Sequence, residues 1–117
     1  MDRDELRERT KVFAHRCVKL ATALPERTLG RHIRSQLIRS ATAVAANYRA
    51  ACVAQSRAAF IAKLSIVVEE VDESGFWMEF LVDEGLTARQ RVAPLLEEGK
   101  ELTAIFVAAR RTTRKTK

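Results

Sequence analysis

The chain has 117 residues, of which 47% are hydrophobic and 31% charged, and its net charge is +6. This size predicts a single domain that buries its own core, and the composition is typical of a soluble helical protein. Residues 1–5 lack the apolar core of a signal peptide, and no apolar run approaches the roughly 18 residues that cross a bilayer, so we expect a cytoplasmic protein with no membrane contact.

The first predicted helix covers residues 4–24. Pro25 ends it, because proline disfavours helical geometry in the residue before it. Cys17 falls on this helix and Cys52 on the next; neither has a metal-ligating partner at short spacing, so we expect reduced, buried side chains. The apolar seam of the helix consists of Leu6, Thr10, Phe13, Cys17, Leu20 and Leu24.

A short connector at residues 25–30 precedes a second predicted helix over residues 31–53. Alanine is frequent in its middle, which favours helix and permits a neighbouring helix to approach closely. Its apolar face consists of Ile33, Leu37, Ala41, Val44, Tyr48 and Ala51.

The third predicted helix, over residues 57–84, has the most pronounced apolar pattern. Ser56 is placed to cap its N-terminus, because the hydroxyl can accept a bond from a free backbone N–H one turn later. Gly85 is placed to close it in a left-handed conformation. Its seam consists of Phe60, Leu64, Val67, Val71, Met78 and Leu81.

Further apolar residues spread around the third helix beyond this seam. A surface helix in a monomer should not show so many, so we expect a second copy of the chain to cover them. The alternative is that they fill a wide core, as large aromatic side chains often do. The residues expected at the interface between copies are Ile66, Phe76, Trp77 and Phe80.

The fourth predicted helix covers residues 88–109, with Thr87 and Gln90 spaced as a capping box. Pro94 leaves two alternatives: a continuous, bent helix, or a separate turn at residues 88–92 before the main helix. The seam consists of Val92, Leu95, Gly99, Leu102, Phe106 and Ala109. We expect residues 110–117 to form a disordered tail.

Four amphipathic helices with short connectors predict an all-α, antiparallel up-down-up-down four-helix bundle. Charge is unevenly distributed along it. Residues 27–49 carry five arginines and no acid, whereas residues 56–84 carry two basic residues and seven acids. This contrast predicts ion pairs between the second and third helices, formed by Arg34 or Arg39 with Glu70 or Glu73.

The acidic cluster at residues 69–73 also admits a site for a hard cation. Glu70 and Glu73 lack the histidine partners of di-metal bundle sites, so we expect a solvated or arginine-paired face and no metal. His15 and His32 have no orienting partner, and the sequence contains no catalytic or phosphate-binding motif. We therefore predict no enzymatic activity and no cofactor.

One pattern spans nearly the whole chain, from about Val12 to Phe106. It resembles the four-helix bundle family whose first members are encoded in intervening sequences of 23S ribosomal RNA genes. The pattern lies on helix surfaces and contains no catalytic signature, so it indicates a fold and a family rather than a reaction. Its residues are Lys11-Val12-Phe13, Gln36-Leu37, Arg39-Ser40-Ala41, Asn47-Tyr48-Arg49, Ser56-Arg57, Phe60-Ile61-Ala62-Lys63-Leu64, Glu70, Asp72-Glu73, Trp77 and Glu79.

The resemblance implies a bundle that often assembles as a ring-like homopentamer. It extends to the accessory variability determinant proteins of diversity-generating retroelements, which are basic pentamers that bind RNA and a reverse transcriptase. Many family members have proline and serine just before the asparagine of the second helix and Glu-Gly soon after it. This chain has Ala45-Ala46 and Ala50-Ala51 instead, which should straighten that helix.

Nucleic-acid binding is the leading functional hypothesis, because the basic side chains of several copies would displace counterions from phosphates. A nucleic-acid enzyme is a further possible partner. A protein-interaction scaffold is the alternative, and a small-molecule site ranks last because the alanine-rich second helix favours tight packing. The candidate contact residues are Arg110, Arg111, Arg114, Lys115 and Lys117 in the tail, with Arg31 and Arg49 on the second helix.

Overall fold

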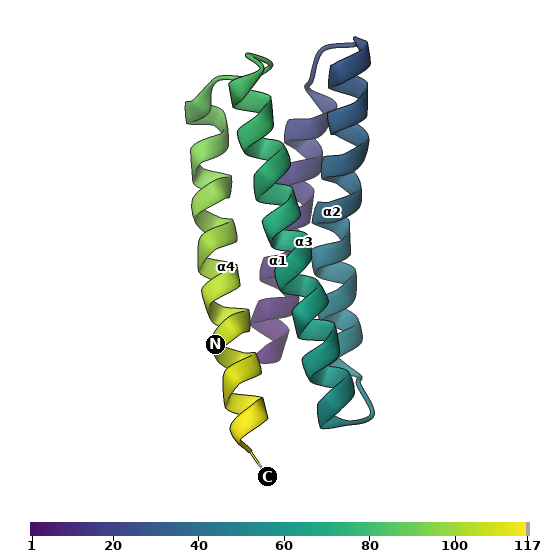
Figure 1. Ribbon diagram of the computed structural model, residues 1–117, viewed down its shortest axis with the longest axis vertical. Helices are drawn as coiled ribbons and strands as arrows, with labels where there is room; N and C mark the ends of the chain where they lie inside the picture. The colour runs from purple at the N-terminus through teal and green to yellow at the C-terminus, as the bar shows by residue number, and fades with distance from the viewer. Residues whose placement is uncertain (117) are drawn as a thin grey trace.

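The computed structural model describes residues 1–116 as four helices: α1 (Arg3–Thr22), α2 (Thr28–Cys52), α3 (Arg57–Asp83) and α4 (Arg89–Lys115). Consecutive helices run in opposite directions, forming a rod of 50 × 21 × 20 Å (Figure 1). The upper end in Figure 1 holds the α1–α2 and α3–α4 turns. The lower end holds the α2–α3 turn, and the C-terminus also lies there. The predicted all-α four-helix bundle is confirmed.

The core consists of the four predicted seams. Phe13, Ile33 and Phe106 are fully buried. The ring centroids of Tyr48 on α2 and Phe106 on α4 lie 5.1 Å apart across the core. Only Leu20, Phe60 and Ala109 of the seam residues are half-buried. Within residues 1–116, no helix combines the length and apolar character that a membrane crossing requires.

The predicted caps of α3 are confirmed. The hydroxyl of Ser56 accepts a bond from the Ala59 N–H at 3.0 Å. Gly85 has a φ of 70°, and the N–H of Leu86 bonds the Leu81 carbonyl at 2.9 Å, so the helix ends in a left-handed glycine turn. The predicted capping box of α4 is wrong, because the N-cap is Ala88 and it makes no side-chain bond.

α1 ends two residues before its predicted end and α2 begins three residues before its predicted start, so the connector is residues 23–27 in place of 25–30. Gly30 lies inside the first turn and is buried, because the backbone of Pro25 packs directly on it. The structure also distinguishes between the two alternatives for Pro94. α4 is one helix from Arg89 onwards, with Pro94 in its second turn, so no separate turn precedes it.

The predicted disordered tail is wrong for residues 110–116, because α4 continues to Lys115. Arg110 donates to the Ser65 hydroxyl at 3.2 Å, which ties this part of α4 to α3. Arginine and lysine are good helix formers, and their charges are favourable at a helix C-terminus. Lys117 lies outside the described residues.

A buried polar contact joins α2 to α3. The hydroxyls of Ser40 and Ser74 lie 2.9 Å apart with no exposure to solvent, and each also lies near a carbonyl one turn earlier, that of Leu37 or Glu70. We predict that Ser74→Ala lowers the free energy of unfolding by about 1–2 kcal/mol, because Ser40 keeps a buried hydroxyl with a poorer partner. Urea unfolding should show that Ser40→Ala costs less stability in the Ser74→Ala variant than in the natural chain. Additive losses of stability would contradict a coupled pair.

Candidate nucleic-acid interface

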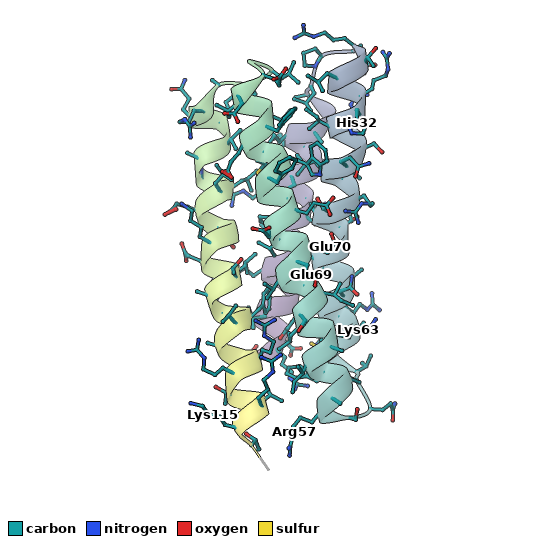
Figure 2. The ribbon with its side chains drawn as sticks, viewed as in Figure 1. His32, Arg57, Lys63, Glu69, Glu70 and Lys115 are labelled. Atoms are coloured by element: carbon teal, nitrogen blue, oxygen red, sulfur yellow. The ribbon has the colours of Figure 1, made fainter. Side chains whose placement is uncertain are left out.

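The lower end of the bundle brings together three helix segments that contain no acidic residue. These are α2 from residue 40, α3 up to residue 68 and α4 from residue 102. Because neighbouring helices are antiparallel, all three segments occupy the same half of the rod. Figure 2 shows Arg57 and Lys115 at this end, Lys63 above them, and His32 near the upper end. We call the following residues the basic end: Arg49, Arg57, Lys63, Arg110, Arg111, Arg114 and Lys115.

The cations of the basic end differ from other arginines of the bundle in forming no ion pair within the described residues. None of the seven forms a salt bridge within residues 1–116, in contrast to Arg9, which pairs with Glu98 at 2.6 Å higher on the bundle. Arg110 donates to a neutral hydroxyl, that of Ser65. Uncompensated positive charge on one end produces a potential that attracts polyanions.

The acidic residues of this end lie on α1. Asp2 caps that helix by accepting a bond from the Glu5 N–H at 2.8 Å, and this bond lowers the pKa of Asp2. Asp4 pairs with Arg7 one turn later. Acids at a helix N-terminus stabilise it, so these carboxylates serve α1 itself. The basic surface therefore lies mainly on α3 and α4, whereas Arg49 of α2 faces a groove that Asp4 and Glu8 of α1 also line.

Arg31 does not join the basic end, contrary to the predicted grouping with Arg49. Both residues are exposed on α2, but their separation of eighteen positions corresponds to about 27 Å along the helix. Arg31 therefore lies towards the upper end, and only Arg49 lies in the lower half of the rod.

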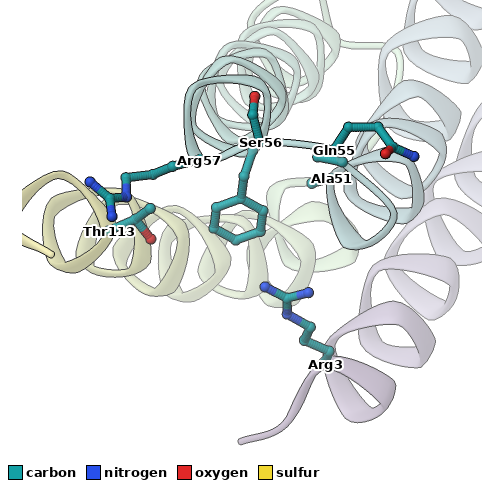
Figure 3. Close-up of a pocket in the computed structure, with 8 residues that line it drawn as sticks. Arg3, Ala51, Gln55, Ser56, Arg57 and Thr113 are labelled. Atoms are coloured by element: carbon teal, nitrogen blue, oxygen red, sulfur yellow. The ribbon is translucent and has the colours of Figure 1, made fainter. Parts of the chain in front are cut away.

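A hollow of about 280 Å³ opens at the basic end, where the α2–α3 turn meets α1 and α4 (Figure 3). Arg3 donates to the Cys52 carbonyl at 3.4 Å, and its guanidinium carbon lies 5.0 Å from the centre of the Phe60 ring. Figure 3 shows Arg3 reaching the hollow from α1, and Arg57 on another side beside Thr113. The lining consists of Arg3, Ala51, Ala54, Gln55, Ser56, Arg57, Phe60 and Thr113.

Sequence reasoning placed none of Arg3, Arg57, Lys63 and Phe60 in a binding site. A usable signal was present in the chain: the acid-free segments fall at alternate ends of successive helices. In an up-down bundle the C-terminal half of one helix lies beside the N-terminal half of the next, so these acid-free segments lie at the same end. Combining the predicted topology with the charge pattern would have identified Arg57 and Lys63.

The predicted ion pairs form with Arg39 and not with Arg34. The Arg39 guanidinium contacts Glu70 at 3.3 Å and also contacts Glu73, which lowers the pKa of Glu73. The indole N–H of Trp77 donates to the same Glu73 carboxylate at 3.2 Å. Arg34 pairs instead with Glu26 at 2.5 Å, because the α1–α2 turn brings that acid close to it.

The upper half of α3 is strongly acidic, in contrast to its basic lower half. Within residues 1–116 no cluster of histidine, cysteine and carboxylate side chains has the arrangement of a metal site. The acids of the upper half are Glu69, Glu70, Asp72, Glu73, Glu79, Asp83 and Glu84.

Cys17 and Cys52 are free thiols, and burial raises the pKa of Cys17 to about 12, which keeps it protonated at neutral pH.

An aromatic patch, defined as Phe76, Trp77 and Phe80, lies on the same half of α3. Its rings are in contact, with centroids 4.9 Å apart for Phe76 and Trp77 and 5.8 Å for Phe76 and Phe80. Phe76 is 53% exposed, whereas Trp77 and Phe80 are half-buried against the core. Ile66 is half-buried farther down the helix and lies outside this cluster. The patch thus combines core packing with an uncovered apolar ring.

These features define a long antiparallel four-helix bundle with one basic end and an aromatic patch near the other. The sequence pattern of the 23S rRNA-intervening sequence protein family matches residues 4–108, and the chain belongs to this family. It is also similar to the crystal structure of a protein of unknown function from the S23 ribosomal protein family of Bacteroides thetaiotaomicron, with a TM-score of 0.87 and 29% identity over 95% of this chain and 99% of that one. No curated protein matches the chain.

Proposed function

We propose that this protein is a non-enzymatic, homo-oligomeric accessory protein that binds RNA through the basic end. The observation that supports the proposal is the concentration of seven unpaired cations on three helix segments without a single acid. Lysine and arginine side chains displace counterions from phosphates, which gives binding that depends on salt and little on sequence.

The helical state of residues 110–115 sharpens this proposal. A flexible tail would lose backbone freedom on binding RNA, whereas the backbone that carries the α4 cations is already fixed by the helix. Arg110 and Arg114, and likewise Arg111 and Lys115, are four residues apart and share a side of the helix. RNA therefore meets a fixed array of charges.

Self-association would multiply this array. The exposed ring of Phe76 supports an interface at the aromatic patch, since an uncovered aromatic cluster is a common centre of protein contacts. A homopentamer is the form we propose. Parallel copies would place five basic ends at one face of the ring, and the summed charge would strengthen binding to RNA.

Neutralising the α4 cations tests the RNA proposal. We expect the triple variant Arg111→Gln, Arg114→Gln, Lys115→Gln to bind single-stranded RNA more weakly and to lower the slope of log K against log salt by about 2, because each phosphate contact contributes about 0.7. Fluorescence anisotropy over a salt series measures this slope.

A matched control makes the test specific to the basic end. The triple variant Arg16→Gln, Lys19→Gln, Arg31→Gln removes the same charge from exposed positions at the other end. It should leave the slope unchanged. An equal loss in both variants would show that RNA responds only to net charge, and the proposed surface would be wrong.

A protein-interaction scaffold is the second candidate, and the exposed Phe76 beside acidic residues favours it. In that case the patch would bind another protein and the basic end would be incidental. Purification from a native lysate with and without nuclease separates the two. Loss of co-purifying material after nuclease treatment supports RNA binding, and a protein partner retained after nuclease supports the scaffold.

A further inference from the structure

The hollow at the basic end combines two features that single-stranded nucleic acid requires. It has cationic side chains on two sides, from Arg3 and Arg57, and no acidic residue lines it. It also contains an aromatic side chain, Phe60, which is only half-buried. Phosphates and flat bases are recognised by these two chemistries together.

From this arrangement we infer that the hollow binds one unstacked nucleotide of single-stranded RNA, with the base against the Arg3–Phe60 pair and a phosphate beside Arg57. The inference rests on the proposed RNA binding and adds to it the form of RNA that is bound. The α4 cations alone would contact phosphates and would not recognise the base.

The Arg3–Phe60 pair supplies the stacking surface. The guanidinium lies 5.0 Å from the ring centre, and it is anchored by a bond to the Cys52 carbonyl. Nucleobases stack on aromatic rings and on guanidinium planes, and this stacking tolerates any base. The guanidinium covers the ring face beneath it, so the base would stack on the outer side of the guanidinium, with Phe60 behind it.

Arg57 and Arg110 give the backbone a path away from the hollow. Arg57 begins α3 on the side of the hollow where Thr113 of α4 lies (Figure 3). Arg110 precedes Thr113 by three residues and shares its side of that helix, whereas Arg114 and Lys115 are turned away from it by about 100° and 200°. A strand whose base occupies the hollow therefore has a neighbouring phosphate next to a further cation.

The geometry favours single strands over duplexes. Bases within a duplex are stacked on one another and are not free to enter a hollow, whereas the bases of single strands can be splayed onto protein side chains. The cations alone do not discriminate in this way, because both forms of RNA present phosphates. A higher affinity for single-stranded RNA than for duplex RNA would therefore distinguish binding in the hollow from binding by the cations alone.

Phe60→Leu tests the inference without changing charge. We expect it to weaken binding of a short oligoadenylate by about 5-fold or more, the loss of one stacked base, and to change the affinity for an RNA duplex by less than about 2-fold. Anisotropy measurements at one salt concentration give both affinities. Phe60→Tyr, which keeps the ring, should bind oligoadenylate as the natural chain does, and it serves as the reference if leucine disturbs the fold.

Two further variants complete the experiment. Arg57→Gln should lower the salt slope for oligoadenylate by about 1, as the loss of one phosphate contact requires. Val12→Ala, a neutral change at an exposed apolar residue outside the hollow and the aromatic patch, should affect neither ligand. Equal effects of Phe60→Leu on both RNA forms, or no effect on either, would overturn the nucleotide site while leaving salt-dependent RNA binding intact. Absence of salt-dependent binding in the natural chain would instead remove the proposed function.

Discussion

Replacing Gly30 with alanine should lower the free energy of unfolding by about 2–3 kcal/mol, although alanine is the better helix former. A Cβ atom at this position would lie 2.2 Å from the carbonyl oxygen of Pro25. That oxygen belongs to the backbone of the α1–α2 turn and also accepts a bond from the Arg27 N–H, so it cannot move without disturbing the turn. Urea unfolding of the purified protein measures the change.

Gly75→Ala is the matched control, since this glycine is also helical. A Cβ there meets only the end of the Leu96 side chain, at 3.9 Å, which is ordinary contact. We expect this variant to be neutral or to gain up to about 1 kcal/mol from the higher helix propensity of alanine. Similar losses of stability at Gly30 and Gly75 would show that glycine is needed for some reason other than the lack of space at the turn.

Introducing a charge at Phe76 should dissolve the proposed oligomer. The Phe76→Asp chain is expected to sediment as a particle of 13.2 kDa at concentrations where the natural chain is assembled. The reason is that an interface formed on the aromatic patch would bury the carboxylate without a partner, and Glu73 and Glu79 nearby already carry the same charge. Analytical ultracentrifugation gives the mass directly.

Val12→Asp provides the comparison for this experiment. Val12 is 44% exposed on α1, so the change places the same charge on a similarly exposed apolar residue outside the patch. It should leave the mass of the assembly unchanged. A natural chain that sediments as a monomer would contradict both the interface and the pooling of basic ends, but it would leave the basic end of each copy in place.

Local sequence rules predicted most of the bundle correctly. The seam residues were identified from their three- and four-residue spacing, because one helix face must be buried in any bundle. Ser56 and Gly85 were identified because their cap chemistry depends only on neighbouring residues. The start of α2 was missed because Gly30 resembles a turn residue, and its real role depends on Pro25 folding back onto the helix.

The end of α4 was missed for a similar reason. A cluster of basic residues at a chain end usually frays, but Arg110 is fixed by Ser65, which lies 45 residues earlier in the sequence. Such a partner is visible only once α3 and α4 lie together. Arg34 shows the same limit, since its choice of Glu26 over Glu70 is decided by the shape of a turn.

The candidate site was only partly predictable. The α4 cations and Arg49 remain candidate contact residues at the lower end, whereas Arg31 lies in the other half of the rod, because linear charge counts ignore the length of a helix. Arg3 and Phe60 required the three-dimensional structure, since they meet across α1 and α3.

The division of α3 into a basic lower half and an acidic upper half has a kinetic consequence. A molecule with opposite charges at the two ends of a rod experiences a torque near a polyanion, which turns the positive end forward before contact. Collisions are thereby aligned in advance, and the association rate rises most at low ionic strength. In the proposed binding to RNA, the seven upper carboxylates would thus help to orient the protein without touching the nucleic acid.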